Sequence, residues 1–187
     1  MSTIFRAARR VSEVSATFSI VTSTIAVATG VYAGSTVLVA FGAIGYVDAC
    51  GSIALAHHFR HGLRNDALED RFERRAHRIV KFGLISIGVA TIVVSGARIA
   101  TGASAEESIL GAIVAAVSVV ALAILSRRKT QIAALVPSPA LRADGHLSAV
   151  GAMQAAVALL GIVLSVDALA AAAVGAVAVV LGARAKA

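Results

Sequence analysis

Long apolar runs separated by short polar segments dominate this sequence. An α-helix needs about 20 mostly apolar residues to cross roughly 30 Å of hydrocarbon. The apolar runs predict an all-α membrane protein with a single transmembrane domain over residues 1–187. Its six expected transmembrane helices cover about residues 14–33, 35–59, 79–100, 109–125, 140–164 and 167–181.

One polar segment is longer than the others and carries both signs of charge. It follows the second apolar run, over about residues 60–78, and is predicted to be a charged cytoplasmic loop. Its Ala, Leu, Glu and Arg residues favour a helix, and Asp70 and Arg74 stand one helical turn apart. The third helix is therefore expected to begin early and to project into the cytoplasm.

The basic residues are distributed unevenly between the two expected sides of the membrane. If the chain crosses six times, all but one of the 17 Lys and Arg residues lie on one side. The other side holds Arg98 with the acidic Glu106 and Glu107. Because membrane insertion resists the translocation of cationic loops, both termini are predicted to be cytoplasmic. The expected location is the plasma or inner membrane, with the lipid bilayer as a partner.

Composition narrows the class of protein further. Hydrophobic residues make up 58% of the chain, and the mean hydropathy is +0.88. The net charge of +7 does not indicate nucleic-acid binding, because the basic residues stand between apolar runs. No catalytic motif is apparent, so neither an enzyme nor a cofactor is expected. The single cysteine, Cys50, lies in an apolar run and is interpreted as a small buried residue.

Small residues are expected to mediate helix packing, because lipid gives apolar helices no hydrophobic reason to associate. The chain has 16 glycines, and Gly30 and Gly34 form a GxxxG spacing at the end of the first helix. The sixth helix consists almost wholly of Ala, Val and Gly. Such surfaces suit either packing within one chain or a homodimer, and the pattern leaves both open.

Ionisable residues within the apolar runs are the candidate functional groups. A charge near the bilayer centre costs at least about 2.5 to 3.5 kcal/mol unless it is paired or hydrated. Asp48 is expected about 16 Å from the inner end of the second helix. Asp144 and His146 are expected one to two turns into the fifth helix. Glu13 and Asp167 are interpreted as residues that open the first and sixth helices.

An intramembrane Asp with a nearby His or second Asp can bind a divalent cation such as zinc and exchange it for protons. Asp48 is therefore a candidate metal ligand, assisted by His146 and Asp144. The alternative for Asp48 is a hydrogen bond that fixes the packing of a neighbouring helix. Asp144 has its own alternative, as a helix cap or as a partner of Arg142 or another basic residue near the inner face.

Several features together resemble the cation diffusion facilitator (cation efflux) family. These are the six helices, the charged segment after the second helix, the acidic residue in mid helix two, and two short motifs. Residues 140–145, Ala-Leu-Arg-Ala-Asp-Gly, look like the family's opening of helix five. Residues 73–76, Glu-Arg-Arg-Ala, are similar to the segment entering helix three. Short bacterial relatives of vesicular zinc-efflux proteins, lacking the cytoplasmic C-terminal domain, are the nearest in pattern.

The resemblance implies a metal site built from two ligands on helix two and two on helix five. Residue by residue, these positions fall on Ile44, Asp48, Leu147 and Gly151, of which only Asp48 is a ligand type. One carboxylate cannot hold zinc in a four-coordinate site. The expected site is therefore incomplete.

Two interpretations remain open. Ser52, one turn beyond Asp48, could join His146 and Asp144 in a shifted metal site. The protein would then export a divalent cation, with zinc as the expected cargo, in exchange for protons, as a homodimer. Alternatively, the chain keeps the fold but is a transport-inactive scaffold or accessory subunit that binds a partner protein.

Overall fold

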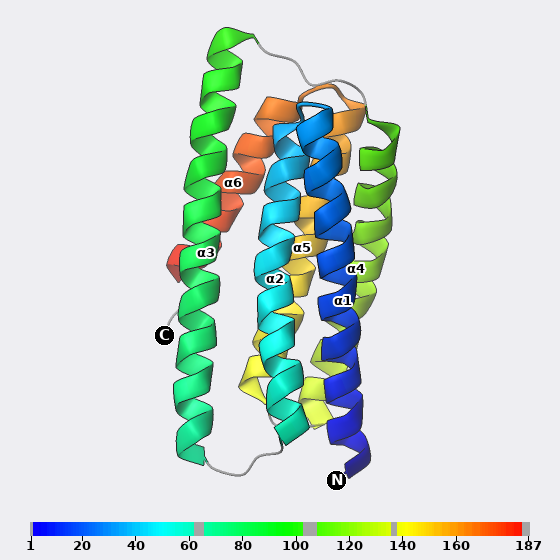
Figure 1. The fold of residues 1–187 in the computed structure, drawn as a ribbon, viewed down its shortest axis with the longest axis vertical. Coiled ribbons are helices and arrows are strands. Elements are labelled where there is room, and N and C mark those ends of the chain that lie inside the picture. The colour runs from blue at the N-terminus through cyan, green and yellow to red at the C-terminus, as the bar shows by residue number, and fades with distance from the viewer. Residues whose placement is uncertain (1, 62–65, 103–107, 136–137, 185–187) are drawn as a thin grey trace.

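The computed structural model describes residues 2–61, 66–102, 108–135 and 138–184, and this part of the chain forms six helices with no strand (Figure 1). The predicted all-α class is confirmed. The helices are α1 (Ser2–Tyr32), α2 (Thr36–His61), α3 (Asp66–Thr101), α4 (Ile109–Leu135), α5 (Pro139–Val163) and α6 (Asp167–Arg184).

Three helices extend well beyond their apolar runs, into segments rich in charge. α3 begins at Asp66, so its predicted early start is confirmed and the loop predicted over 60–78 is wrong for most of its length. Strong helix formers in this segment explain the difference. α1 begins at Ser2 and is braced there by an ion pair between Arg9 and Glu13 at 2.7 Å, one turn apart. α4 continues to Leu135 instead of ending near residue 125.

Five helices within the described ranges are long and apolar enough to cross a membrane: α1, α2, α4, α5 and α6. α3 contains a shorter apolar stretch, Ile87–Thr101. Large apolar side chains such as Val31, Val93 and Val120 lie exposed on the outer surface, where lipid would cover them. These features indicate a multi-pass membrane protein, while the six-span count and the side of the termini stay predictions.

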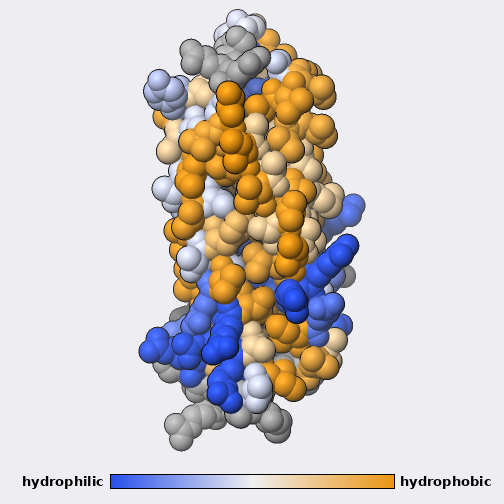
Figure 2. Space-filling view, turned by 90° about the vertical axis from the view of Figure 1, so that its right-hand side faces the viewer, coloured by the Kyte–Doolittle hydropathy of each residue, from blue (hydrophilic) through white to orange (hydrophobic). Residues whose placement is uncertain are grey.

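The helices alternate in direction and pack as three neighbouring pairs, α1 with α2, α4 with α5, and α3 with α6. The first two pairs form a four-helix bundle, and the α3–α6 pair flanks it (Figure 1). The start of α1, the end of α2 and the start of α3 lie at the same end. We call this the basic end, because hydrophilic residues gather towards it while hydrophobic residues dominate the other half (Figure 2).

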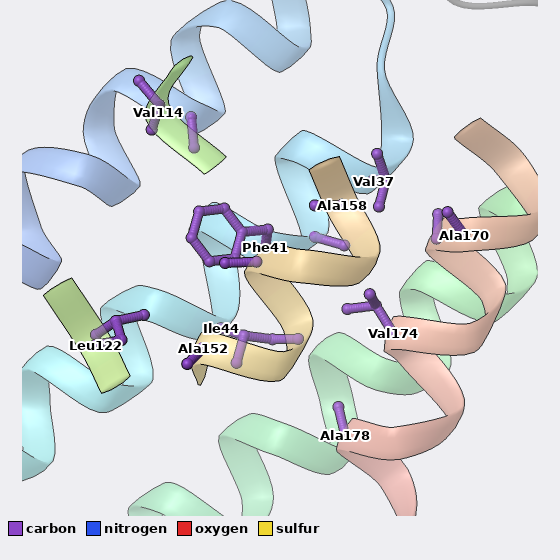
Figure 3. Packing of buried hydrophobic residues seen from close by; sticks show 14 of the residues in the cluster. Val37, Phe41, Ile44, Val114, Leu122, Ala152, Ala158, Ala170, Val174 and Ala178 are labelled. Carbon is purple, nitrogen blue, oxygen red and sulfur yellow. The ribbon is translucent and has the colours of Figure 1, made fainter. Parts of the chain in front are cut away.

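The larger of two apolar clusters lies between the helices in the middle of the molecule and away from the basic end, and a smaller one with Leu55, Phe59 and Leu141 lies near the basic end. Figure 3 shows Phe41 and Ile44 of α2 facing small residues of α5, with Val174 of α6 beside them. Many core positions are alanines, including Ala152 and Ala158, which let helix backbones approach closely. The predicted use of small residues in packing is confirmed for this core.

Polar contacts tie α2, α3 and α6 together at the opposite end. Asp167, the first residue of α6, accepts hydrogen bonds from the Ser35 hydroxyl and from the Thr36 backbone N–H, the latter at 2.9 Å. Arg98 of α3 donates to the Gly34 carbonyl and to the Thr36 hydroxyl. Gly34 has φ +62°, which a residue with a Cβ adopts only under strain. The prediction that Asp167 opens the sixth helix is confirmed, and its carboxylate also caps α2.

Close packing of α3 on α6 depends on Gly88, and we expect Gly88→Ala to weaken it. An added Cβ would lie 2.7 Å from the Gly175 carbonyl oxygen, which is backbone and cannot turn away. The expected cost is about 1–3 kcal/mol of unfolding free energy, as for other overpacked sites. The change in unfolding free energy is measured by unfolding both proteins in mixed micelles.

Gly96→Ala is the matched control, because Gly96 is on the same helix with no atom within 4 Å of an added Cβ. It should leave stability unchanged or raise it slightly, since Ala favours helix over Gly. Equal effects of the two substitutions would contradict the packing role of Gly88.

Candidate functional site

Asp48 lies buried in the middle of α2, with 5% of its surface exposed. It is about 18 Å along the helix from Thr36 and about 20 Å from His61. Ser19 of α1 donates a hydrogen bond to Oδ2 at 2.7 Å, and Ser148 of α5 lies 3.4 Å from Oδ1. The deep carboxylate predicted from the sequence therefore contacts two neighbouring helices.

A second buried carboxylate, Asp144 of α5, forms an ion pair with Lys129 of α4. Lys129 Nζ lies 2.7 Å from Asp144 Oδ2, and the two side chains are 0% and 4% exposed respectively. The ammonium also donates to Ser52 at 3.0 Å and to Ser148 at 2.9 Å. Since an ammonium has three N–H donors, every one of them has a partner.

Serine hydroxyls join the two carboxylates into one network. Ser52 lies 3.2 and 3.3 Å from the two carboxylate oxygens of Asp144, and 3.2 Å from the Ser15 hydroxyl. Ser148 contacts both Lys129 and Asp48. We call this group the Lys129 network; its members are Ser15, Ser19, Asp48, Ser52, Lys129, Asp144 and Ser148.

Helical spacing explains why these residues meet. On α1 the buried serines fall at positions 12, 15, 19 and 23, which share one face of a helix. Asp48 and Ser52 are one turn apart on α2, as are Asp144 and Ser148 on α5. Gly145 lets α5 approach α4, because an added Cβ there would lie 3.2 Å from the Lys129 Cβ.

The structure brings together three of the four predicted metal ligands. Asp48, Asp144 and Ser52 all belong to the Lys129 network, whereas His146 lies on the exposed face of α5. Asp144 pairs with Lys129, so the predicted alternative of a basic partner near the inner end is confirmed, although Arg142 is not that partner. Its predicted alternative as a helix cap is wrong, because Ser138 caps α5.

Apolar packing fills the positions at which the family resemblance implied further ligands. Ile44 is buried in the core, as Figure 3 shows, and Leu147 packs against the same cluster. An added Cβ on Gly151 would lie 3.2 Å from the Leu122 side chain. On α2, Asp48 and Ser52 follow Ile44 towards the basic end. On α5, Asp144 and Ser148 lie nearer that end than Gly151 does.

The donor atoms of the network limit its chemistry. Among the residues that the structure describes, no three His, Cys, Asp or Glu side chains come together as a metal site. The network offers two carboxylates and several hydroxyls, all oxygen donors, together with one ammonium. With both carboxylates ionised and Lys129 protonated, it carries one net negative charge. The arrangement suits an ammonium or another cation that accepts oxygen ligands.

Two other predicted placements are wrong. Glu13 does not open the first helix, because α1 begins earlier and Glu13 pairs with Arg9 on an exposed face. Cys50 is exposed rather than buried, since it lies on the outward face of α2. Both errors have the same cause. Apolar runs define neither the residue at which a helix begins nor which of its side chains face outwards.

Lys129 is the central residue that sequence reasoning missed. Placing the end of helix four near residue 125 assigned Lys129 to an inner loop with Arg127 and Arg128. A longer helix would have put it on the same face as Leu122 and Leu125, which are buried. The spacing of the α1 serines was the second available signal.

A scan against protein-family models finds no matching family, and no curated protein matches the sequence. Membership of the cation diffusion facilitator family therefore stays a prediction from short motifs.

The Lys129–Asp144 pair should behave as a unit in a double-mutant cycle. Lys129→Met leaves a buried carboxylate without its counter-charge and is expected to cost about 3–5 kcal/mol of unfolding free energy. Combining it with Asp144→Asn removes both charges and should recover much of that loss. The cycle compares the unfolding free energies of the intact protein, the two single variants and the double variant, all measured in mixed micelles.

Additive effects of the two substitutions would contradict a direct ion pair. Ser126→Ala is a suitable control, because Ser126 is on the same helix outside the Lys129 network. Its change in unfolding free energy should be small beside that of Lys129→Met.

Proposed function

We propose that this protein is a proton-coupled cation transporter of the membrane, with Asp48 and Asp144 as the carboxylates that bind the cation. The observation that carries the proposal is the Lys129 network itself. Two carboxylates, an ammonium and four serines lie buried at membrane depth between α1, α2, α4 and α5. Ionisable groups at such depth are costly and commonly line ion or proton pathways.

Lys129 gives the proposal a mechanism, because its ammonium stands where a transported cation would bind. A divalent cation entering between Asp48 and Asp144 would repel the ammonium at close range. The cation can bind once Lys129 gives up its proton to water, or once a protonated carboxylate of the pair releases its proton. Cation binding is then linked to proton release, as an exchanger requires.

The cargo we propose is a divalent cation moving out of the cytoplasm. Zinc, expected from the family resemblance, is bound well by His and Cys, but His146 lies outside the network. Carboxylate and hydroxyl oxygens favour harder ions such as manganese or magnesium. The donor set thus supports a divalent cation in general and a harder one than zinc in particular.

The proposal includes six membrane crossings with both termini in the cytoplasm. This topology is supported by the alternating directions of the helices and by the gathering of hydrophilic residues at the basic end, where Arg6, Arg10 and Arg128 lie. We also propose a homodimer in a plasma or inner membrane, in which exposed apolar helix surfaces meet. Nothing in the network requires residues from a second copy.

The second candidate function is a transport-inactive scaffold or accessory subunit. It is favoured by the complete set of partners around Lys129, since an ammonium satisfied by Asp144, Ser52 and Ser148 is stable without a metal. In this function the network fixes the packing of four helices. The exposed apolar surface would then bind a partner protein.

Cation flux into proteoliposomes with an acidic interior tests the two candidates. The intact protein should accumulate manganese or zinc only while the proton gradient lasts. Asp48→Asn removes one of the two carboxylates and should lower the rate at least about tenfold, the size of one lost charged contact. Raising the external proton concentration should slow uptake, because protons compete for the same carboxylates.

Asp167→Asn is the matched control, since it makes the same chemical change at a buried aspartate outside the network. It should keep the flux of the intact protein. A folded intact protein with no gradient-dependent flux of any divalent cation would overturn the transporter and favour the scaffold.

A binding measurement separates the roles of Lys129 and the metal. Lys129→Gln removes the competing ammonium, so divalent cations should raise its melting temperature more than that of the intact protein. Manganese should act more strongly than zinc if the oxygen donors decide selectivity. Absence of any shift in both proteins at saturating cation would contradict a cation site.

A further inference from the structure

A groove runs between α1 and α4 at the basic end of the molecule. Its volume is about 560 Å³. Three arginines line it together with apolar side chains; the arginines are Arg6, Arg10 and Arg128, and the apolar residues include Val14, Leu125 and Ile132. Arg6 and Arg10 are one turn apart, so both point from the same face of α1. The groove is therefore cationic on an apolar floor.

The charge of the groove is of one sign. No acidic side chain is among the described residues that line it. Glu13, the acidic residue of this part of α1, is engaged by Arg9, which does not line the groove. All three groove arginines have exposed side chains. An anionic ligand would thus meet several guanidinium groups, which bind phosphate in a bidentate manner.

The groove lies where the polar part of the surface meets the apolar part. Apart from Ile4 near its start, the large exposed apolar side chains of α1 occur from Val14 to Tyr32, a rise of about 27 Å, close to the thickness of a hydrocarbon core. Figure 2 shows this side of the molecule, with hydrophilic residues towards the basic end and hydrophobic residues above them. Arg10, one turn before Val14, is then level with lipid headgroups.

We propose that this groove binds an anionic phospholipid of the membrane leaflet at the basic end. The phosphate sits among Arg6, Arg10 and Arg128, and the acyl chains run along Val14 and Leu125 into the bilayer. Basic pockets between transmembrane helices recognise acidic headgroups through this combination of charge and depth. The proposal depends on membrane insertion but not on transport.

Charge also distinguishes a lipid from a second copy of the chain. A two-fold symmetric contact through the groove would bring six arginines together, three from each copy. A phospholipid supplies both the anion and the apolar chains that the groove lining requires. The bound lipid would bridge α1 and α4, which contribute Ser15, Ser19 and Lys129 to the Lys129 network.

Lipid retention measured by native mass spectrometry tests the proposal. The protein is placed in nanodiscs of phosphatidylcholine containing a minor fraction of phosphatidylglycerol. The intact protein should retain phosphatidylglycerol in preference to phosphatidylcholine. The variant Arg6→Gln/Arg10→Gln/Arg128→Gln should lose this preference, by about fivefold for each arginine and roughly a hundredfold in total.

A second triple variant controls for net charge. Arg127→Gln/Arg142→Gln/Arg184→Gln removes three exposed arginines that do not line the groove, and it should retain the lipid as the intact protein does. Equal loss in the two triple variants, or equal retention, would overturn the site. If the groove variant fails to fold, Arg10→Gln alone should still show the fivefold loss, and unchanged retention would count against the proposal.

Competition identifies the ligand as a lipid rather than a free anion. Inorganic phosphate and glycerol phosphate carry the anion without acyl chains, and neither should displace phosphatidylglycerol at comparable concentration. Displacement by either compound would show a free-anion site and overturn the lipid proposal.

Discussion

The arrangement of the four-helix bundle depends on keeping one lysine charged and satisfied inside an apolar environment. Hydrogen bonds between membrane helices average only about 0.6 kcal/mol each, so the single contacts of Ser19 or Ser15 add little. An unpaired buried charge costs several times more. Lys129 therefore constrains α2 and α5 to present Ser52, Asp144 and Ser148 at one level, because any other register leaves its ammonium without partners. The Lys129 network sets the register of the helices, and the alanine-rich core packs next to it.

The charges of the network are compatible with the proposed exchange as well as with packing. It contains two carboxylates and a single tethered cation, so its charges do not cancel fully. A network that only held the helices together would need only Lys129 and Asp144, yet it also contains Asp48. The contact of Asp48 with Ser148 is long, at 3.4 Å, whereas its hydrogen bond from Ser19 is 2.7 Å. Asp48 is thus held firmly by α1 and only weakly by the partners of Lys129. A carboxylate placed in this way can gain a cation without first losing an ion pair of its own.

The fold could be predicted from the sequence because apolar runs and basic loops follow simple rules of length and charge. A helix covers each of the six predicted apolar runs, although α1, α3 and α4 extend beyond them, and the distance of Asp48 from the helix end predicts its depth. The contacts that could not be predicted depend on which side chains of a helix face inwards and on how far those side chains extend. Lys129 belongs by sequence to a basic cluster, but α4 extends past it and its long side chain turns inwards. His146 is one residue from an expected ligand position, and a step of about 100° around α5 leaves it on the outside.

The clasp formed by Asp167 and Arg98 at the opposite end has a mechanical consequence. It joins the α1–α2 turn to both α3 and α6, so the flanking pair is anchored to the bundle at that end by charge as well as by packing. Without Asp167 and Arg98, the flanking pair would be held to the bundle at that end by the packing of apolar side chains alone.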